Sequence, residues 1–164
     1  MSNAYIAGVG FYVPPKIVTN DELSQYMNTT DKWIRERTGI QTRHYVEKGV
    51  GPSDLAIPAT EQALNSASLS VRDIDFIIFA TSTPDYYIPG SGCLLQEKMG
   101  FREIGALDIR VQCSGFLYGL SIAEQYIKTG SFKNILLVGA EVQSTAMDLS
   151  DEGRDTAVIF GDGA

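Results

Sequence analysis

The chain has 164 residues, a length typical of one domain, and 44% of them are hydrophobic and 20% charged. This composition is ordinary for a globular protein and excludes low-complexity and fibrous chains. The formal net charge of −7 argues against nucleic-acid binding, because nucleic-acid-binding proteins are usually basic. The longest apolar stretch, residues 135–140, is far shorter than the ~20 residues that a membrane-spanning helix needs. Two cysteines are too few for a disulfide framework and no secretory signal is recognised, so we expect a cytoplasmic protein.

The first part of the chain is predicted to contain one strand and two helices. Residues 5–10 are expected to form a strand, and residues 12–19 stay extended because Pro14 and Pro15 forbid a helix there. A first helix is expected through residues 23–27, with Thr19 or Asn20 as its cap. The second helix is expected to begin near Thr30 or Asp31 and to end at Gly39.

Strands and helices alternate over the rest of the chain. A helix capped by Ser53 or Asp54 carries Pro58 inside its pattern, which indicates either a later start at Pro58 or a kink. The elements expected after it are a strand at 75–81, a helix at 92–99, a strand at 106–111, a helix at 115–129 and strands at 135–141 and 156–160. This alternation predicts a layered α/β fold with a largely parallel sheet.

Cys113 lies where a predicted strand turns into a predicted helix. The positive end of a helix favours a thiolate, which is the nucleophilic form of cysteine, so this position suits covalent catalysis. The alternative is a small buried cysteine that fills a gap in the core. Cys93 also begins a predicted helix and is therefore a rival nucleophile on physical grounds.

A local basic cluster stands out on this acidic chain. Four cationic residues fall within a dozen positions whose only acid is Glu36: Lys32, Arg35, Arg37 and Arg43. Such a cluster suits a phosphate-bearing ligand, although a solvated helix face gives the same pattern.

Four motifs in order resemble the β-ketoacyl-acyl-carrier-protein synthase III family of condensing enzymes. They occupy residues 31–40 (DKWIRERTGI), 73–75 (DID), 112–116 (QCSGF) and 160–164 (FGDGA). The resemblance implies a thiolase-like layered α/β fold with a mostly parallel sheet flanked by helices. It also implies that residues 1–164 form the amino-terminal one of two pseudo-equivalent halves, with the carboxy-terminal half absent from this chain.

The resemblance implies an acyltransferase. Enzymes of this family take an acyl group from acyl-coenzyme A onto a cysteine, here Cys113. They then condense it with malonyl-acyl-carrier protein in a decarboxylative Claisen reaction that initiates fatty acid synthesis. Acyl-CoA is a substrate, so no cofactor and no metal are expected, and the family suggests a homodimer.

Further site residues follow from the resemblance alone. Coenzyme A is expected to contact Thr29, Trp33, Arg37 and Arg154, with Trp33 stacked on the adenine. An aromatic face with guanidinium groups suits adenine and phosphate, although Trp33 also fits a core anchor and Arg154 a solvated loop charge. The family's catalytic His and Asn are expected in the other half, so His44 is interpreted as structural and Cys93 as a small core residue.

Ile88 departs from the family's usual pattern. Many bacterial members carry Phe before the equivalent of Pro89, and that residue reaches the acyl tunnel of the partner subunit. Ile88 is therefore expected at the substrate pocket and dimer edge, with primer chain length left open.

Two other functions remain open. One is a related thiolase-fold enzyme: a synthase that forms hydroxymethylglutaryl, ketone or quinolone products, or a thioesterase. The other is a non-catalytic fragment, which would bind nucleotide or a partner at most and would tend to associate because the predicted strand at 156–160 ends its sheet.

Overall fold

The computed structural model describes residues 3–164, which divide into two compact units. Unit 1 contains the chain up to Tyr12, Gly51–Glu141 and Ala164, and unit 2 contains Val13–Val50 and Val142–Gly163. Across residues 3–164, each helix is too short or too polar to cross a membrane.

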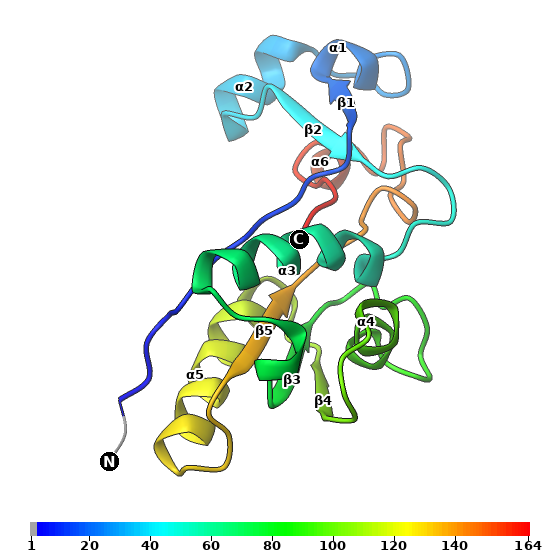
Figure 1. Ribbon diagram of the computed structural model, residues 1–164. Coiled ribbons are helices and arrows are strands. Elements are labelled where there is room, and N and C mark those ends of the chain that lie inside the picture. The colour runs from blue at the N-terminus through cyan, green and yellow to red at the C-terminus, as the bar shows by residue number, and fades with distance from the viewer. Residues whose placement is uncertain (1–2) are drawn as a thin grey trace. The chain divides into compact units, whose positions relative to one another are not determined.

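A parallel sheet of three strands forms the centre of unit 1 (Figure 1). Its order is β4 (Gly105–Ile109), β3 (Phe76–Ala80), β5 (Ile135–Gly139), and Ile78 lies opposite both Leu107 and Leu137. β3 is apolar on both faces and almost entirely buried, as expected of the central strand of a parallel sheet.

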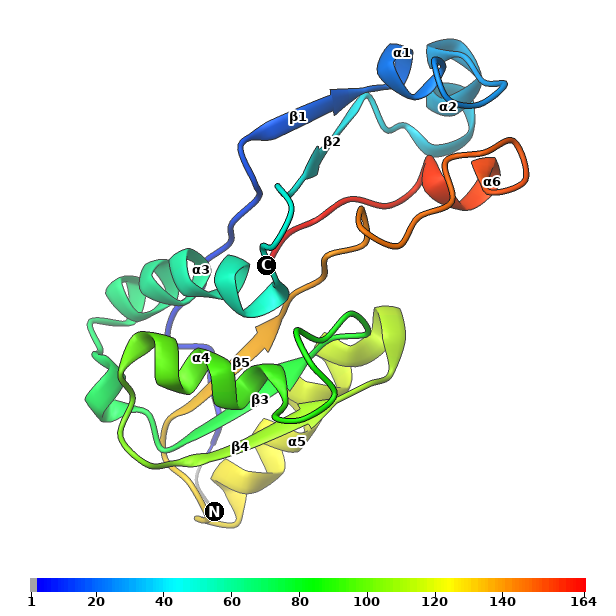
Figure 2. The ribbon, with the colours of Figure 1, turned by 90° about the vertical axis from the view of Figure 1, so that its right-hand side faces the viewer.

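Helices cover both faces of this sheet (Figures 1 and 2). α3 (Pro52–Ala67) and α4 (Ser91–Met99) pack on one face, and α5 (Gly115–Lys128) packs on the other. Two 3₁₀ turns, η1 (Val71–Asp73) and η2 (Gln112–Ser114), precede β3 and α5. The main core lies between the sheet and the α3–α4 layer and contains Ala56, Leu64, Ile74, Ile77, Phe79, Leu95, Phe101, Leu136, Val138 and Ala140.

Unit 2 is built on an antiparallel pair of short strands, β1 (Lys16–Thr19) and β2 (Thr42–Tyr45). Its helices are α1 (Asn20–Leu23), α2 (Asp31–Thr38) and α6 (Arg154–Ala157). They enclose a second apolar cluster of Val18, Leu23, Met27, Ile34, Tyr45, Ala157 and Val158.

The predicted strand at 5–10 is wrong. This segment pairs with no strand in the described chain; instead Gly8 and Gly10 lie against α3. A Cβ at Gly10 would come within 2.1 Å of the Ala59 carbonyl oxygen, so only glycine permits this approach. The large side chains beside them are exposed: Tyr5, Ile6, Val9 and Phe11.

The predicted strand at 156–160 is also wrong. The amide N–H groups of Thr156 and Ala157 donate to the Gly153 carbonyl oxygen, which starts the helical turn α6. Ala157 and Val158 are apolar because this turn buries them in the second cluster. α1 ends at Leu23 and not at residue 27.

The other predicted elements are confirmed within a few residues. Three of their ends follow from capping: Thr30 caps α2 by accepting a hydrogen bond from the Trp33 amide, and Gly39 and Gly100 end α2 and α4 with positive φ. α3 begins at Pro52 and continues through Pro58, so a start at Pro58 is excluded. β2 was not anticipated by the sequence pattern.

Candidate active site

Cys113 lies in the 3₁₀ turn η2, between the end of β4 and the start of α5. The thiol is exposed, so the alternative of a buried gap-filling cysteine is wrong. Gln112, directly before it, has a φ of +46°. A side-chain-bearing residue rarely adopts this left-handed conformation, and the strain it costs is typical of turns that present a functional group.

The N-terminus of α5 has no side-chain cap. Ser114 stands at the capping position, but its hydroxyl donates to the Val111 carbonyl oxygen at 3.0 Å. The Gly115 amide donates to the Gln112 carbonyl oxygen, but no side chain of the capping residue occupies the positive end of this 14-residue helix, which therefore favours a negative charge beside Cys113.

Gly115 fixes the turn against the sheet. It is buried, and a Cβ built on it would lie 3.0 Å from the Cβ of Ala80 at the end of β3. The start of α5 thus packs directly on the sheet, two residues after Cys113.

The rival thiol, Cys93, lies in the first turn of α4 and is also exposed. Its expected place as a small core residue is therefore wrong. The Asp108 carboxylate accepts hydrogen bonds from the Ser91 and Gly92 amides at 2.6 and 2.9 Å, so a negative charge already occupies this helix start. Desolvation raises the pKa of Asp108, against the lowering effect of these two donors. The contrast in capping favours Cys113 over Cys93 as the nucleophile.

A second cluster of predicted site residues lies in unit 2, around Trp33 on α2. The guanidinium carbons of Arg37 and Arg154 lie 4.3 and 4.6 Å from the centre of the Trp33 ring. Arg37 is one turn further along α2, and Arg154 is the first residue of α6. Two of the four residues expected to bind coenzyme A therefore contact a third, Trp33.

Contacts with the loop before α2 hold Arg154 in this cluster. Its guanidinium donates to the Asn28 carbonyl oxygen at 3.2 Å and to the Asp155 carboxylate at 3.0 Å. The Asp151 carboxylate in turn accepts a hydrogen bond from the Asn28 amide. Thr29, the fourth expected residue, is next in the chain; it is buried, and its Oγ1 finds no hydrogen-bond partner within residues 3–164.

The basic cluster noted in the sequence does not act as one surface. Arg43 is buried, where it donates to the Asn20 side chain at 2.7 Å and to the Val158 carbonyl oxygen at 3.3 Å. Burial lowers the pKa of Arg43. Two other members form surface pairs within α2, Arg35 with Asp31 and Lys32 with Glu36. Arg37 is the one of the four that faces Trp33.

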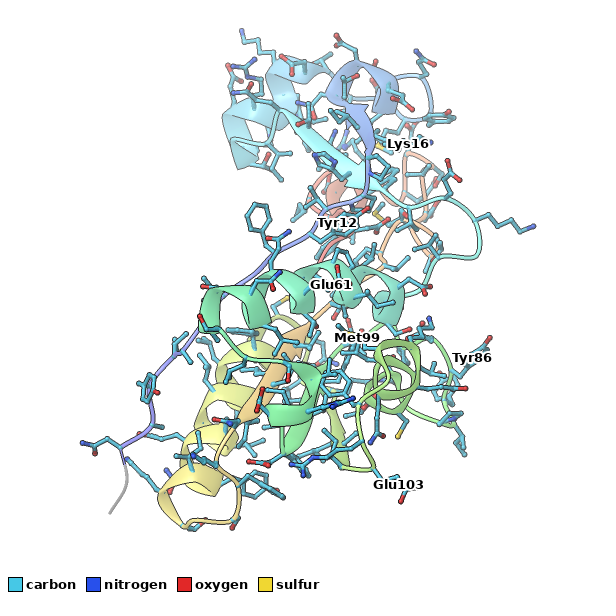
Figure 3. The ribbon with its side chains drawn as sticks, viewed as in Figure 1. Tyr12, Lys16, Glu61, Tyr86, Met99 and Glu103 are labelled. Atoms are coloured by element: carbon cyan, nitrogen blue, oxygen red, sulfur yellow. The ribbon has the colours of Figure 1, made fainter. Side chains whose placement is uncertain are left out.

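Ile88 lies in the loop between β3 and α4 with 90% of its surface exposed. Tyr86 and Tyr87 precede it and are also exposed; Tyr86 is labelled in Figure 3. Arg110, which is three residues before Cys113 in the chain, places its guanidinium carbon 5.5 Å from the centre of the Tyr87 ring.

His44 accords with a structural interpretation, because its Nδ1 pairs with the Pro14 carbonyl oxygen beside β1.

Two acidic residues organise polar networks that sequence reasoning missed. Glu141 accepts hydrogen bonds from the Ser82 amide and hydroxyl and from the Thr83 hydroxyl, at 2.7, 2.9 and 2.6 Å. Asp162 accepts from the Val46 and Ser144 amides at 2.7 and 2.8 Å. Two signals in the sequence could have found them: Glu141 directly follows the apolar run at residues 135–140, and Asp162 lies between two glycines.

Within residues 3–164, no three His, Cys, Asp or Glu side chains gather as a metal site would require.

A parallel sheet covered by helices, with a cysteine at an uncapped helix start, makes this an α/β protein, and comparison with solved structures identifies the fold as thiolase-like. Over 96% of this chain and 50% of the other, the structure matches 3-oxoacyl-[acyl-carrier-protein] synthase III from Aquifex aeolicus, with a TM-score of 0.91 and 42% identity. Residues 107–164 match the family model described as 3-oxoacyl-[acyl-carrier-protein (ACP)] synthase III.

Two curated relatives extend the match over nearly the whole chain. It is 45% identical to β-ketoacyl-[acyl-carrier-protein] synthase III 1 of Bacillus anthracis over 162 residues, which are 99% of this chain and 52% of the relative. It is 46% identical to the synthase III of Methylococcus capsulatus over 159 residues, 97% of this chain and 49% of the relative. The chain belongs to the β-ketoacyl-acyl-carrier-protein synthase III family, and it spans about half the length of the curated relatives it matches.

Proposed function

We propose that this chain carries the acyl-accepting cysteine of a condensing enzyme that initiates fatty acid synthesis. An acyl group passes from acyl-CoA to Cys113 and is then joined to the malonyl group of malonyl-acyl-carrier protein with loss of carbon dioxide. The observation that supports this most strongly is the exposed thiol of Cys113 at the uncapped start of α5. The names of the relatives support the same reaction.

The first half-reaction is a transfer between two thioesters. The Cys113 sulfur attacks the carbonyl carbon of acyl-CoA, and the carbon–sulfur bond to coenzyme A then breaks. The thiol proton of Cys113 ends on the released coenzyme A, so acyl-Cys113 and free coenzyme A are the products. In this proposal the amide of Cys113 and the positive end of α5 stabilise the negative charge that develops on the carbonyl oxygen.

The Trp33 cluster is proposed to hold the nucleotide of coenzyme A. A planar base stacked between Trp33 and a guanidinium group needs about 7 Å between them, two contact distances of about 3.5 Å each. Both guanidinium carbons lie closer to the ring than that, so binding the base requires one of them to move outward. Arg37 and Arg154 then remain within reach of phosphate, and Thr29 contributes its buried hydroxyl.

The rest of the proposal concerns assembly and location. The enzyme acts as a homodimer in which the exposed Ile88 reaches the acyl pocket of the partner subunit. It needs no resident cofactor, because acyl-CoA supplies the reacting group. A cytoplasmic location fits two exposed, unpaired cysteines.

A product assay on the full-length protein tests the function. With acyl-CoA and malonyl-acyl-carrier protein, we expect one 3-oxoacyl-acyl-carrier-protein product and one carbon dioxide for each acyl group used. Malonyl-CoA is expected to replace the carrier poorly, and Cys113→Ser is expected to abolish the product. Release of free fatty acid or a ketone, or preference for malonyl-CoA, would favour the related thiolase-fold enzymes instead.

A further inference from the structure

The loop from Thr81 to Gly90 has an exposed tip and a firmly held base. At the tip, Tyr87 and Ile88 are 87% and 90% exposed. Exposed apolar side chains on a loop normally move freely unless the loop is fastened nearby. Here a carboxylate fastens the loop on each side of the tip.

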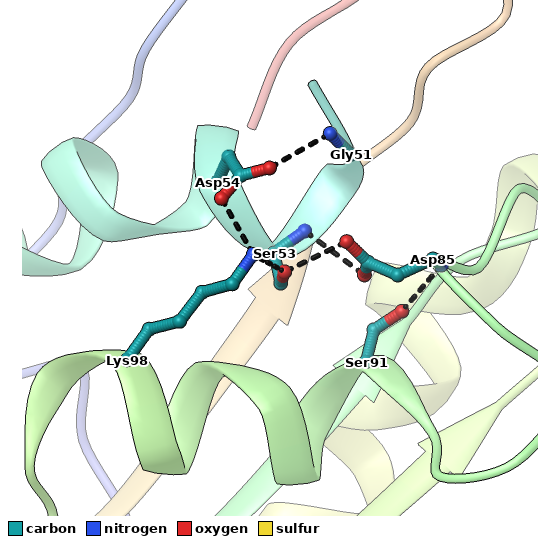
Figure 4. A network of polar contacts seen from close by, with 6 residues as sticks. All are labelled: Gly51, Ser53, Asp54, Asp85, Ser91 and Lys98. Atoms are coloured by element: carbon teal, nitrogen blue, oxygen red, sulfur yellow. Dashed lines mark hydrogen bonds and ion pairs between the residues drawn. The ribbon is translucent and has the colours of Figure 1, made fainter. Parts of the chain in front are cut away.

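Asp85 fastens the first side to the start of α3 (Figure 4). Its carboxylate accepts hydrogen bonds from the Ser53 hydroxyl at 2.7 Å and the Ser53 amide at 3.2 Å. Ser53 is fully buried and also accepts a hydrogen bond from the Lys98 ammonium group at 2.7 Å. The Asp85 amide donates a hydrogen bond to the Ser91 hydroxyl oxygen at 3.1 Å, so Asp85 connects α3, α4 and the loop.

Gly51 leaves the space that this carboxylate occupies. A Cβ at Gly51 would lie 2.1 Å from one carboxylate oxygen of Asp85 and 2.9 Å from its carboxyl carbon. The φ of Gly51 is −108°, which any residue adopts, so the glycine is required by the close approach and not by the backbone.

Asp108 fastens the other side of the tip. Its carboxylate binds the Ser91 and Gly92 amides, immediately after the loop, and it belongs to the strand that leads to Cys113. The Arg110 guanidinium meets the Tyr87 ring from the same segment. The tip is therefore held at a fixed place beside the chain that carries the nucleophile.

We propose that Asp85 is a positioning residue for acyl-chain selectivity: through Ser53 it fixes the loop tip that carries Ile88. This inference rests on the proposed function of Cys113 and Ile88. Asp85 touches no reacting atom. Its role is to set how much room the loop tip leaves for the acyl chain in the acyl pocket that the tip reaches, which is that of the partner subunit. Loss of the anchor changes which acyl chains are accepted more than it changes the chemistry at Cys113.

The test measures acylation of Cys113 in the full-length protein by intact mass, with acetyl-CoA and octanoyl-CoA in parallel. Asn in place of Asp85 keeps the shape of the side chain but replaces one carboxylate oxygen with an NH₂ group. The Ser53 amide and hydroxyl each donate to one of these oxygens, so at least one hydrogen bond is lost. We expect Asp85→Asn to change the ratio of the two acylation rates by about tenfold, the size associated with a hydrogen bond to a charged group. Gly51→Ala should shift the ratio in the same direction, because it displaces the carboxylate without removing it.

Asp73→Asn is the matched control. Asp73 accepts hydrogen bonds from the amide and hydroxyl of one serine, Ser70, at 2.8 and 2.7 Å; both reach one carboxylate oxygen, whereas Ser53 reaches both oxygens of Asp85. Its variant should leave the ratio unchanged. An unchanged ratio in both Asp85→Asn and Gly51→Ala, or an equal shift in Asp73→Asn, overturns the inference while Cys113 is still acylated. Absence of any adduct on the wild-type protein overturns the proposed function itself.

Discussion

Replacing Gly115 with Ala should slow acylation of Cys113 in a protein that still folds. The new methyl group would lie 3.0 Å from the Cβ of Ala80. Both carbons are attached directly to the backbone, so neither can rotate away. Reaching an ordinary carbon–carbon contact of about 3.8 Å requires the start of α5 to move from β3 by about 0.8 Å.

The magnitudes follow from this displacement. Overpacking costs about 1–3 kcal/mol, and Ala recovers up to about 1 kcal/mol of helix propensity relative to Gly, so the fold should lose at most about 3 kcal/mol. A displacement near 1 Å at the nucleophile costs about 100-fold in rate, so we expect acylation to slow by about 10- to 100-fold. Rapid-quench mass spectrometry with acetyl-CoA measures the rate, and urea unfolding measures the stability.

Gly119→Ala is the matched control, one turn further along α5. Its Cβ would lie 2.4 Å from Cδ1 of Leu137, the end of a side chain that can change rotamer. Acylation should stay within about twofold of wild type, because the helix start does not move. Adding Ala80→Gly to Gly115→Ala should restore most of the rate. A wild-type rate in Gly115→Ala, or equal slowing in Gly119→Ala, would refute the reasoning.

Three further predictions concern the ligand cluster, acid stability and a helix cap. Trp33→Ala should weaken coenzyme A binding roughly tenfold in calorimetry, because the ring on which the base stacks is lost. Lys32→Ala, which removes an exposed side chain of the same helix, should leave binding unchanged, and equal weakening would contradict the cluster. Hydrogen bonds from the Asn134 amide, which has the largest effect, and from the Lys133 amide and Arg102 hold the pKa of Asp75 below its usual range. Its carboxylate therefore stabilises the fold above about pH 4, and this stability is lost as the pH falls further. Asp75→Asn should cost about 1 kcal/mol at pH 7 and nothing near pH 2 in urea unfolding, and a constant difference would contradict this. Thr30→Ala should cost about 1 kcal/mol by removing the cap of α2, and Thr30→Ser should restore most of it.

Local signals were enough to predict most of unit 1. The apolar run at residues 76–80 and Gly100 after α4 mark elements whose limits depend on their own residues. The segment 5–10 looks the same as a strand, but a strand also needs a neighbour, and none in the described chain pairs with it. The apolar residues Ala157 and Val158 suit a strand or a buried helical turn equally, and only the tertiary core decides between them.

The candidate site was predicted in part, for a related reason. The position of Cys113 at a strand–helix junction follows from the local pattern, and the structure places the thiol there. Arg154 lies far from Trp33 in the sequence, so only the family resemblance pointed to both; the structure brings their side chains together. Arg43 was grouped with its neighbours as a surface charge because its buried partners, Asn20 and Val158, come from distant segments.

The most direct measurement is the site of acylation in the full-length protein. After brief incubation with isotope-labelled acetyl-CoA, the protein is digested at low pH, and the peptides that contain Cys93 and Cys113 are compared by mass spectrometry. We predict one acetyl group on Cys113 and none on Cys93, because α5 begins without a capping side chain whereas the Asp108 carboxylate already caps α4. Label on Cys93, or label that persists in Cys113→Ser, would contradict the assignment of the nucleophile.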